Sequence, residues 1–207
     1  AGSTARCACK SVELHFPEPT PRFRIHCCCV DCLQKAQWAA EHGGPQLPND
    51  VVTLRRPMDL VYFGNRLRVT GHKHLRFTKL RPDSSSTNCV TSCCHTTLLV
   101  DHTYYDGKCL LLFPDLVELE TVLDPPTFVN GSLDWPPKKL KELPPEPPIG
   151  QRVDASGCSW SDKNHAELPP AFEGSVTFEE LLGGRDPEVL GLAEDARSWR
   201  LRSQSDE

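Results

Sequence analysis

The feature that most constrains this chain is a run of closely spaced cysteines, His26-Cys-Cys-Cys-Val-Asp-Cys32. Within it, Cys27, Cys29 and Cys32 form a C-x-C-x-x-C pattern. The two-residue gap is that of zinc knuckles, and alternate residues of an extended segment point the same way, so three thiolates can converge on one Zn²⁺. We therefore predict a zinc site on these three residues. Three protein ligands leave one position of a tetrahedral zinc for another ligand, which is the arrangement of catalytic sites.

A second group of thiols is split along the chain. Cys7 and Cys9 form a C-x-C pair, and the partners available for them are Cys89, Cys93 and Cys94. A structural zinc takes four ligands, so we predict a closed site that joins the first strand to the middle of the domain. The sequence leaves open whether Cys89 or Cys93 completes this site.

The alternative for so many cysteines is the disulfide framework of a secreted protein. Eleven cysteines cannot all pair within the chain, adjacent ones such as Cys93 and Cys94 do not bridge readily, and no signal-peptide pattern is visible. Zinc binding in a reducing compartment, the cytoplasm, is the preferred interpretation. The chain begins at Ala1 rather than at Met, which is compatible with a truncated N-terminus.

The composition is that of a soluble globular protein, with 38% hydrophobic and 25% charged residues. No apolar run approaches the roughly 18 residues that a membrane helix needs, so we expect no membrane association. The formal net charge of −5 argues against a general nucleic-acid-binding role. The expected partner is a small thiol or a thiol adduct, and the oligomeric state does not follow from the sequence.

Alternating hydrophobic residues predict a mainly β chain with one short helix after the C-x-C-x-x-C run. We expect the first two strands to pair as a hairpin across Pro17, Pro19 and Pro21. Good helix formers follow Cys32 up to about Gly43. The strands are expected at residues 11–16, 22–26, 51–54, 60–63, 67–69, 74–80, 97–100 and 109–113.

We divide the chain into a zinc-binding β domain, residues 1–135, and a Pro-rich, acidic extension, residues 136–207. Eleven of the nineteen prolines lie at or beyond Pro125, which predicts extended and partly disordered segments in the extension. Two short helices are expected there, at residues 177–182 with a capping box and at residues 187–199.

Three blocks of the sequence resemble the glutathione-dependent formaldehyde-activating enzyme (GFA) family, which includes the centromere protein V-like proteins and has the Mss4-like zinc fold. The blocks are Cys7-Ala-Cys-Lys-Ser-Val12, Cys27-Cys-Cys-Val-Asp-Cys-Leu-Gln-Lys35 and Cys94-His-Thr-Thr-Leu98. They occur in the family's order, and the resemblance covers about residues 5–115.

The resemblance implies a mostly antiparallel, Mss4-like β fold with two zinc ions. It implies a structural zinc on Cys7, Cys9 and the third block, and a catalytic, glutathione-associated zinc on Cys27, Cys29 and Cys32. The implied activity is that of a carbon–sulfur lyase: glutathione, the candidate co-substrate, is added to a small aldehyde or released from the adduct.

The chain departs from the family pattern near the first and third blocks. Lys10 and His95 stand where the family has glycine. Thr91 stands where the third block has its first cysteine, and Thr97 stands where it has proline. These changes bear on formaldehyde specificity more than on zinc binding.

Several other residues have two interpretations. Asp31 is either a proton relay or an exposed structural carboxylate, and His26 and His95 are either zinc ligands or polar neighbours of the thiols. The aromatic candidates for a pocket near the zinc, each equally well explained by packing, are Trp38, Tyr62, Tyr104 and Tyr105. The alternative function is a non-catalytic zinc-binding interaction module, with the extension as its partner-binding arm.

Overall fold

The structure is a computed structural model that describes residues 2–131, 135, 137–147, 149–151 and 167–192. This part of the chain is mainly β, and its strands form one sheet of four strands and one of nine. Cys158, the later part of the helix expected at 187–199 and the end of the chain lie outside the described residues.

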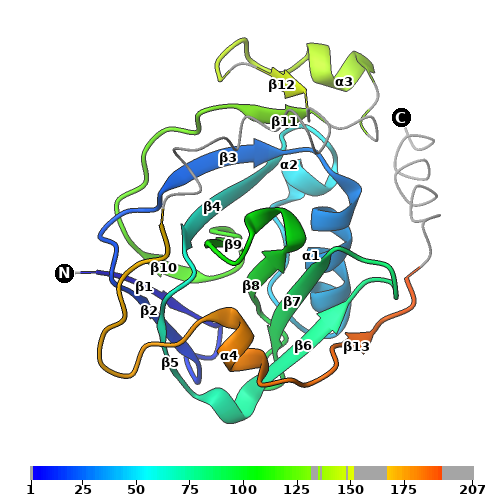
Figure 1. Cartoon of the computed structure of the whole chain (residues 1–207). Coiled ribbons are helices and arrows are strands. Elements are labelled where there is room, and N and C mark those ends of the chain that lie inside the picture. The colour runs from blue at the N-terminus through cyan, green and yellow to red at the C-terminus, as the bar shows by residue number, and fades with distance from the viewer. Residues whose placement is uncertain (1, 132–134, 136, 148, 152–166, 193–207) are drawn as a thin grey trace.

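The smaller sheet is antiparallel throughout and has the order β10–β1–β2–β5 (Figure 1). In its second strand Leu14 and Phe16 are fully buried whereas Glu13 and His15 are half-buried, as the alternation of the sequence predicts. The strands are β1 (Ser3–Arg6), β2 (Glu13–Phe16), β5 (Arg68–Thr70) and β10 (Glu118–Glu120).

The larger sheet has the order β12–β11–β3–β4–β9–β8–β7–β6–β13. Its central pairs are antiparallel, and parallel pairs occur only towards its two ends, β12–β11–β3 and β6–β13. The strands are β3 (Phe23–Cys27), β4 (Met58–Gly64), β6 (Leu75–Lys79), β7 (Ser86–Thr91), β8 (Thr97–His102), β9 (Cys109–Leu112), β11 (Val129–Gly131), β12 (Ile149–Gln151) and β13 (Glu188–Val189).

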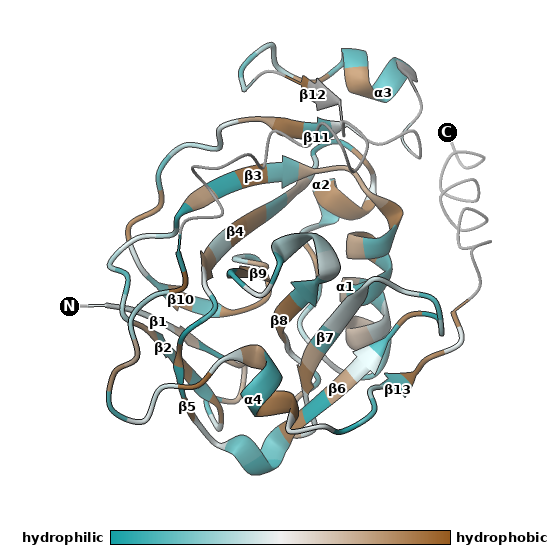
Figure 2. Cartoon of the chain, in the orientation of Figure 1, coloured by the Kyte–Doolittle hydropathy of each residue, from teal (hydrophilic) through white to brown (hydrophobic). Residues whose placement is uncertain are grey.

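The larger sheet is buried on both faces. Every residue of β4 is buried, and alternate residues point into two separate cores, Leu60 and Tyr62 into one and Val61 and Phe63 into the other. Figure 1 shows α1 (Val30–Glu41) against one face and the smaller sheet on the other side. Hydrophobic residues colour much of β4 and β8 in Figure 2, as expected for central strands that are covered on both sides.

One expected strand and one expected strand pairing in the first part of the chain are wrong. Residues 51–54 are not a strand: α2 (Asn49–Val52) occupies this segment, because the amides of Val51 and Val52 both bond to the carbonyl of Pro48. The first two expected strands do not pair as a hairpin either. They are β2 and β3, which belong to different sheets, and the three prolines between them lack the N–H groups that a ladder needs.

The C-terminal segment packs onto the sheets. The expected capping box is confirmed at α4 (Phe178–Leu182), where Thr177 and Glu180 bond each other's backbone. The side chains of Phe178 and Leu181 are buried in the core shared with the smaller sheet. The expected helix at 187–199 is wrong in its described part, because β13 pairs in parallel with β6.

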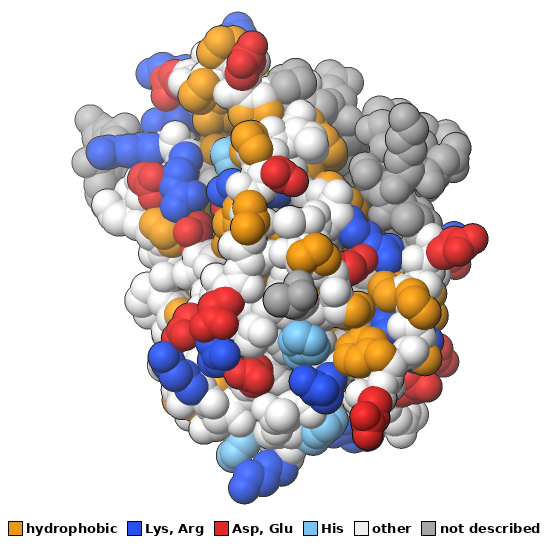
Figure 3. All heavy atoms as spheres, turned by 90° about the vertical axis from the view of Figure 1, so that its left-hand side faces the viewer, with side chains coloured by type: hydrophobic (Ala, Val, Ile, Leu, Met, Phe, Trp, Pro, Cys, Tyr) orange, Lys and Arg blue, Asp and Glu red, His pale blue; other side chains and the backbone are white. Residues whose placement is uncertain are grey.

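The remaining described elements are short. They are α3 (Pro137–Lys141) and the 3₁₀ turns His72–His74 and Thr103–Tyr105. Among the described residues, no helix has the length and apolar character needed to cross a membrane. On the face drawn in Figure 3, acidic and basic side chains lie among one another rather than in separate areas.

Candidate metal centres

The first candidate centre is a four-thiol cluster made of Cys7, Cys9, Cys93 and Cys94, whose sulfurs all lie within 4.8 Å of one another. The first two residues occupy the turn between β1 and β2, and the other two occupy the turn between β7 and β8. Two turns that are distant in sequence and belong to different sheets therefore meet at this cluster.

The spacing of the four thiols fits a tetrahedral zinc. Zn–S bonds of about 2.3 Å place sulfurs about 3.8 Å apart along each edge of the tetrahedron. The observed Sγ–Sγ distances are 3.6 Å for Cys7–Cys9, 3.2 Å for Cys9–Cys93 and 3.9 Å for Cys93–Cys94. The donor set and its geometry thus fit one zinc ion without rearrangement of the turns.

Two threonine hydroxyl groups lie within hydrogen-bond distance of a sulfur of this cluster. The Thr91 and Thr96 hydroxyls lie 3.3 and 3.2 Å from the Cys94 sulfur, and both residues are fully buried. Burial raises the pKa of the Cys94 thiol, but the hydrogen bonds from these hydroxyls outweigh it and lower the pKa to about 6. Thr96 also accepts the amide of Ala8 at 3.0 Å, which ties the two turns together.

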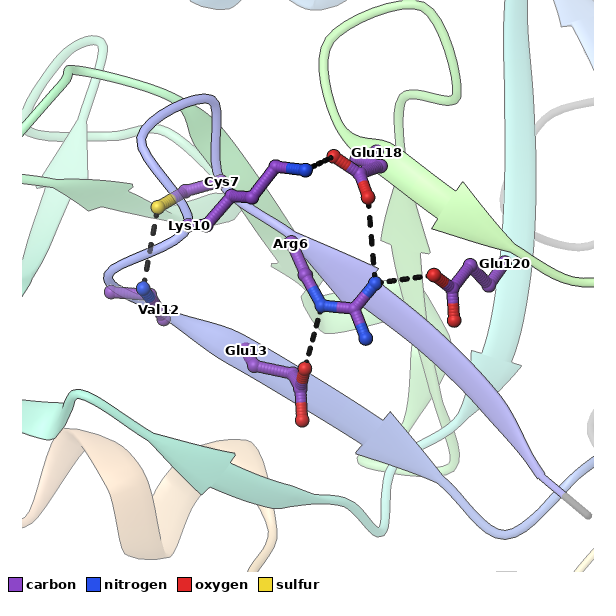
Figure 4. A network of polar contacts seen from close by, with 7 residues as sticks. All are labelled: Arg6, Cys7, Lys10, Val12, Glu13, Glu118 and Glu120. Atoms are coloured by element: carbon purple, nitrogen blue, oxygen red, sulfur yellow. Dashed lines mark hydrogen bonds and ion pairs between the residues drawn. The ribbon is translucent and has the colours of Figure 1, made fainter.

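Charged residues fix the first turn to the edge of the smaller sheet (Figure 4). Arg6 binds Glu13 and Glu120, and Lys10 binds Glu118 at 2.8 Å. The amide of Val12 donates to the Cys7 sulfur at 3.3 Å, as amides do in zinc knuckles. These contacts hold the turn that carries Cys7 and Cys9.

The second candidate centre is a three-thiol cluster, made of Cys27, Cys29 and Cys32, with sulfurs within 4.8 Å of one another. Cys27 ends β3, Cys29 is the N-cap of α1 and Cys32 lies in the first helical turn. The Cys29 sulfur accepts the amide of Cys32 at 3.4 Å, as a capping serine would. Residue Cys29 is partly exposed whereas Cys27 and Cys32 are buried, so the cluster lies closest to the surface at Cys29.

The local field favours a thiolate at Cys29. Hydrogen bonds from Cys27 and Cys32 lower the pKa of the Cys29 thiol well below its usual value, helped by the nearby charge of Lys35. The helix N-terminus adds a positive dipole. Hydrogen bonding to this thiolate raises the pKa of the Cys27 thiol, whose sulfur also lies 3.5 Å from the side-chain amide of Asn130 on β11. These contacts favour a thiolate at Cys29 over one at Cys27.

Two of the aromatic candidates, Tyr62 and Tyr105, are buried in the same core cluster as these thiols. The rings of Tyr62 and Tyr105 meet edge to face at 5.6 Å. Burial raises the pKa of both phenols well above the usual value, and the charges of Cys32 and Cys27 add to the effect. Both phenols therefore stay protonated beside the cluster. Tyr104 is half exposed.

Asp31 is held in an ion pair. Its carboxylate accepts from Arg81 at 2.8 Å, and the same guanidinium donates to Gln34 at 3.1 Å. Arg81 follows β6 of the larger sheet, so this contact joins the first turns of α1 to the segment after β6. The geometry favours the structural interpretation of Asp31, because the guanidinium already occupies one of its oxygens.

Helix α1 connects the two clusters. Its N-terminus carries the three thiols, and the loop after its C-terminus passes over the turn that carries Cys93 and Cys94. A Cβ atom on Gly44 would lie only 2.4 Å from the carbonyl oxygen of His95, so only glycine allows this approach. The Trp38 ring lies against that of His42, with centroids 4.2 Å apart and planes tilted by 30°.

One predicted ligand lies elsewhere. Cys89 is not part of the four-thiol cluster: it is fully buried in β7 opposite Phe77 and Leu99, and Cys93 is the fourth member of the cluster. Cys28 and Cys109, which were not predicted as ligands, are fully buried in the core. Neither His26 nor His95 joins either thiol group.

The residues that support the thiols were not assigned that role from the sequence. These are Thr91, Thr96, Asn130, Lys35 and Arg81. A local signal existed for Lys35 and Thr96, which stand inside the cysteine blocks, and for Thr91, which stands three residues before Cys94. Arg81 is distant in sequence from Asp31, and the contact of Asn130 depends on the parallel pairing of β11 with β3.

Comparisons of the chain with models of known protein families, with curated proteins and with solved structures found no match. The interpretation of the site therefore depends on its residues and their geometry.

Proposed function

We propose that the protein is a zinc-dependent carbon–sulfur lyase-like enzyme of the glutathione-dependent formaldehyde-activating type, which handles thiol adducts of a small aldehyde. The observation that carries this proposal is the difference between the two clusters: one gathers four thiols and the other three. Among the described residues, no further His, Cys, Asp or Glu side chain joins the three-thiol group. A zinc held there by the protein alone would be one ligand short of a tetrahedron.

A zinc ion bound by these three thiolates would supply a Lewis-acidic position at which a thiol such as glutathione is deprotonated near neutral pH. The chain's own groups prepare this position. Cys29 provides anionic character at the solvent-facing side, and Lys35 and the N-terminus of α1 offset the negative charge that the thiolates accumulate.

The reaction joins the thiol sulfur to the carbonyl carbon of the aldehyde. One C–S bond forms, the carbonyl π pair moves to oxygen, and that oxygen takes up the proton that the thiol lost; the reverse reaction releases the aldehyde. The oxygen needs a hydrogen-bond donor as its charge develops. In this proposal the protonated Tyr62 and Tyr105, which lie in the core around the thiols, are the candidate donors.

The test compares wild-type full-length protein with two cysteine variants. Zinc content is measured by mass spectrometry, glutathione binding by calorimetry, and formation of S-hydroxymethylglutathione from glutathione and formaldehyde by NMR exchange. Cys29→Ala should lose one zinc equivalent, glutathione binding and turnover. Cys28→Ala, which removes the neighbouring buried thiol that faces the core, should keep all three.

A protein that holds two zinc ions but neither binds glutathione nor accelerates the exchange would contradict this proposal. The alternative, a non-catalytic zinc-binding interaction module, would then stand, because zinc would serve only the fold.

A further inference from the structure

We propose that Cys9 and Cys93 are a site of oxidative modification. There a peroxide replaces the metal cross-link between the two turns of the four-thiol cluster with a disulfide cross-link. The two thiols are the exposed members of that cluster, and their sulfurs lie 3.2 Å apart. Cys7 is fully buried and Cys94 is partly covered. This inference does not depend on the proposed thiol chemistry at the three-thiol cluster.

The two clusters differ in the solvent exposure of their thiols. A peroxide must reach a sulfur to oxidise it, and two of the four thiols at the first cluster face solvent. At the second cluster Cys27 and Cys32 are buried, and only Cys29 is partly exposed. Oxidation should therefore begin at the four-thiol cluster, although both clusters consist of cysteines.

Geometry selects the pair within the cluster. Disulfides need Cα atoms about 4.4–6.8 Å apart, whereas adjacent Cα atoms are about 3.8 Å apart, which disfavours a bond between Cys93 and Cys94. A bond between Cys7 and Cys9 would require oxidation of a fully buried sulfur. Cys9 and Cys93 come from different turns, are both exposed, and their sulfurs lie 3.2 Å apart, against 3.6 Å for Cys7–Cys9 and 3.9 Å for Cys93–Cys94. These features favour a bond between Cys9 and Cys93.

The chemistry balances with a peroxide as the oxidant. One thiolate attacks the peroxide, the O–O bond breaks, and a sulfenic acid and a hydroxide form. The second thiolate then attacks the sulfenic sulfur, the S–S bond forms and a second hydroxide leaves. In total two thiolates lose two electrons, the peroxide gains them, and two protons from solvent convert the hydroxides into water. Two of the four metal ligands are thereby lost.

Oxidation would therefore change the kind of cross-link between the two turns and leave the fold in place. The metal and the disulfide would both join the β1–β2 turn to the β7–β8 turn, across the same long loop of chain. The oxidised protein should release the zinc of this cluster, keep the zinc of the other, and stay folded.

The test uses the full chain loaded with zinc and treated with hydrogen peroxide in the presence of a chromogenic zinc chelator. Free thiols are then blocked, and the disulfide is mapped by peptide mass spectrometry. We expect release of about one zinc equivalent, a single new Cys9–Cys93 linkage, and recovery after treatment with dithiothreitol and zinc. The oxidised protein should also melt at a higher temperature than the reduced, chelated protein.

The Cys29→Ala variant, which keeps the four-thiol cluster, should release its remaining zinc at the wild-type rate. In Cys9→Ser, no disulfide should form at this cluster; if that variant does not fold, Cys29→Ala carries the test. Retention of zinc in excess peroxide, simultaneous loss of both zinc ions, or a disulfide among Cys27, Cys29 and Cys32 would overturn the proposal. Glutathione takes no part in these measurements, so they are independent of the proposed enzyme activity.

Discussion

Lys10 and His95 each follow the last cysteine of a turn in the four-thiol cluster, and each has a backbone φ in the left-handed region, 62° and 49°. Glycine adopts this conformation freely, whereas other residues lose about 1 kcal/mol or more. Both turns therefore hold a residue with a side chain in a conformation that glycine tolerates better.

This strain can be measured at Lys10 by comparing two substitutions. Lys10→Gly and Lys10→Ala both remove the ion pair with Glu118, but only glycine relieves the backbone. We expect the glycine variant to be more stable than the alanine variant by about 1 kcal/mol in chemical denaturation of the zinc-loaded protein. Equal stability of the two variants would show that the turn relaxes away from the left-handed conformation.

Asp101 on β8 is half-buried, and its Oδ1 atom is inaccessible and has no hydrogen-bond partner. Burial raises its pKa to about 6, from 3.8 for an ordinary Asp, and the nearby Glu179 adds to the effect. The folded state therefore binds the proton more tightly than the unfolded state. Stability is greatest below about pH 4 with respect to this group and falls as the pH rises to about 6.

Asp101→Asn should remove this loss of stability at higher pH. At pH 7 we expect the variant to be more stable than wild type by about 1–3 kcal/mol, and its stability should change less between pH 4 and pH 6. Urea denaturation across this range is the measurement, with Asp83→Asn, an exposed carboxyl in the loop after β6, as the control. If the stability of wild type and of Asp101→Asn changes with pH in parallel, ionisation of the Asp101 carboxyl costs the folded state little free energy, which would contradict this prediction.

At the scale of elements, α4 shows how the C-terminal segment is attached. Its five residues are too few for a stable isolated helix. Phe178 is 2% exposed and meets Phe77 edge to face, and its amide donates to Asn65. Packing and capping therefore hold this helix against the larger sheet.

Phe178→Ala should destabilise the whole protein by about 3 kcal/mol, because it opens a cavity in the core beside the smaller sheet. The loss should appear as one lower transition in thermal unfolding followed by circular dichroism. Val189→Ala on β13, where the side chain is 46% exposed, should change the transition little. A separate early transition in Phe178→Ala would instead indicate that the C-terminal segment folds independently of the sheets.

Local patterns in the sequence predicted the elements with strong periodicity. The burial of Leu14 and Phe16 followed from alternation, and α4 followed from its capping box. The start of α1 was placed too late, because Cys29 is an unusual N-cap that makes the bond serine usually makes. Short strands such as β10, β11 and β12 have no periodic pattern of their own; they exist because neighbouring strands offer them partners.

For the whole molecule, the sequence predicted two groups of thiols and the joining of Cys7 and Cys9 to the segment of residues 89–94, but not which cysteine completes the second group. Spacing alone indicated Cys27, Cys29 and Cys32, since these ligands are neighbours in sequence. The choice of Cys93 over Cys89 needed the fold: Cys89 lies inside a strand and faces the core, whereas Cys93 lies in the exposed turn. Long-range pairing of two turns carries no local signal.

The two clusters should therefore respond differently to loss of a ligand. Cys9→Ser should lose one zinc and several kcal/mol of stability, because the four-thiol cluster joins two turns from different sheets. Cys29→Ala should also lose one zinc but keep the fold, because its cluster lies between consecutive elements. Zinc content and urea denaturation of both variants are the measurements. Global unfolding of Cys29→Ala would make the three-thiol cluster structural.

The central claim is that the three-thiol cluster holds a zinc with a position left for a thiol. Zinc X-ray absorption measures it directly in the protein loaded with two zinc ions. One four-thiol and one three-thiol cluster give an average of about 3.5 sulfurs per zinc, and glutathione should raise that average to about 4. An average of about 4 sulfurs before glutathione is added, or no change after it, would contradict the account.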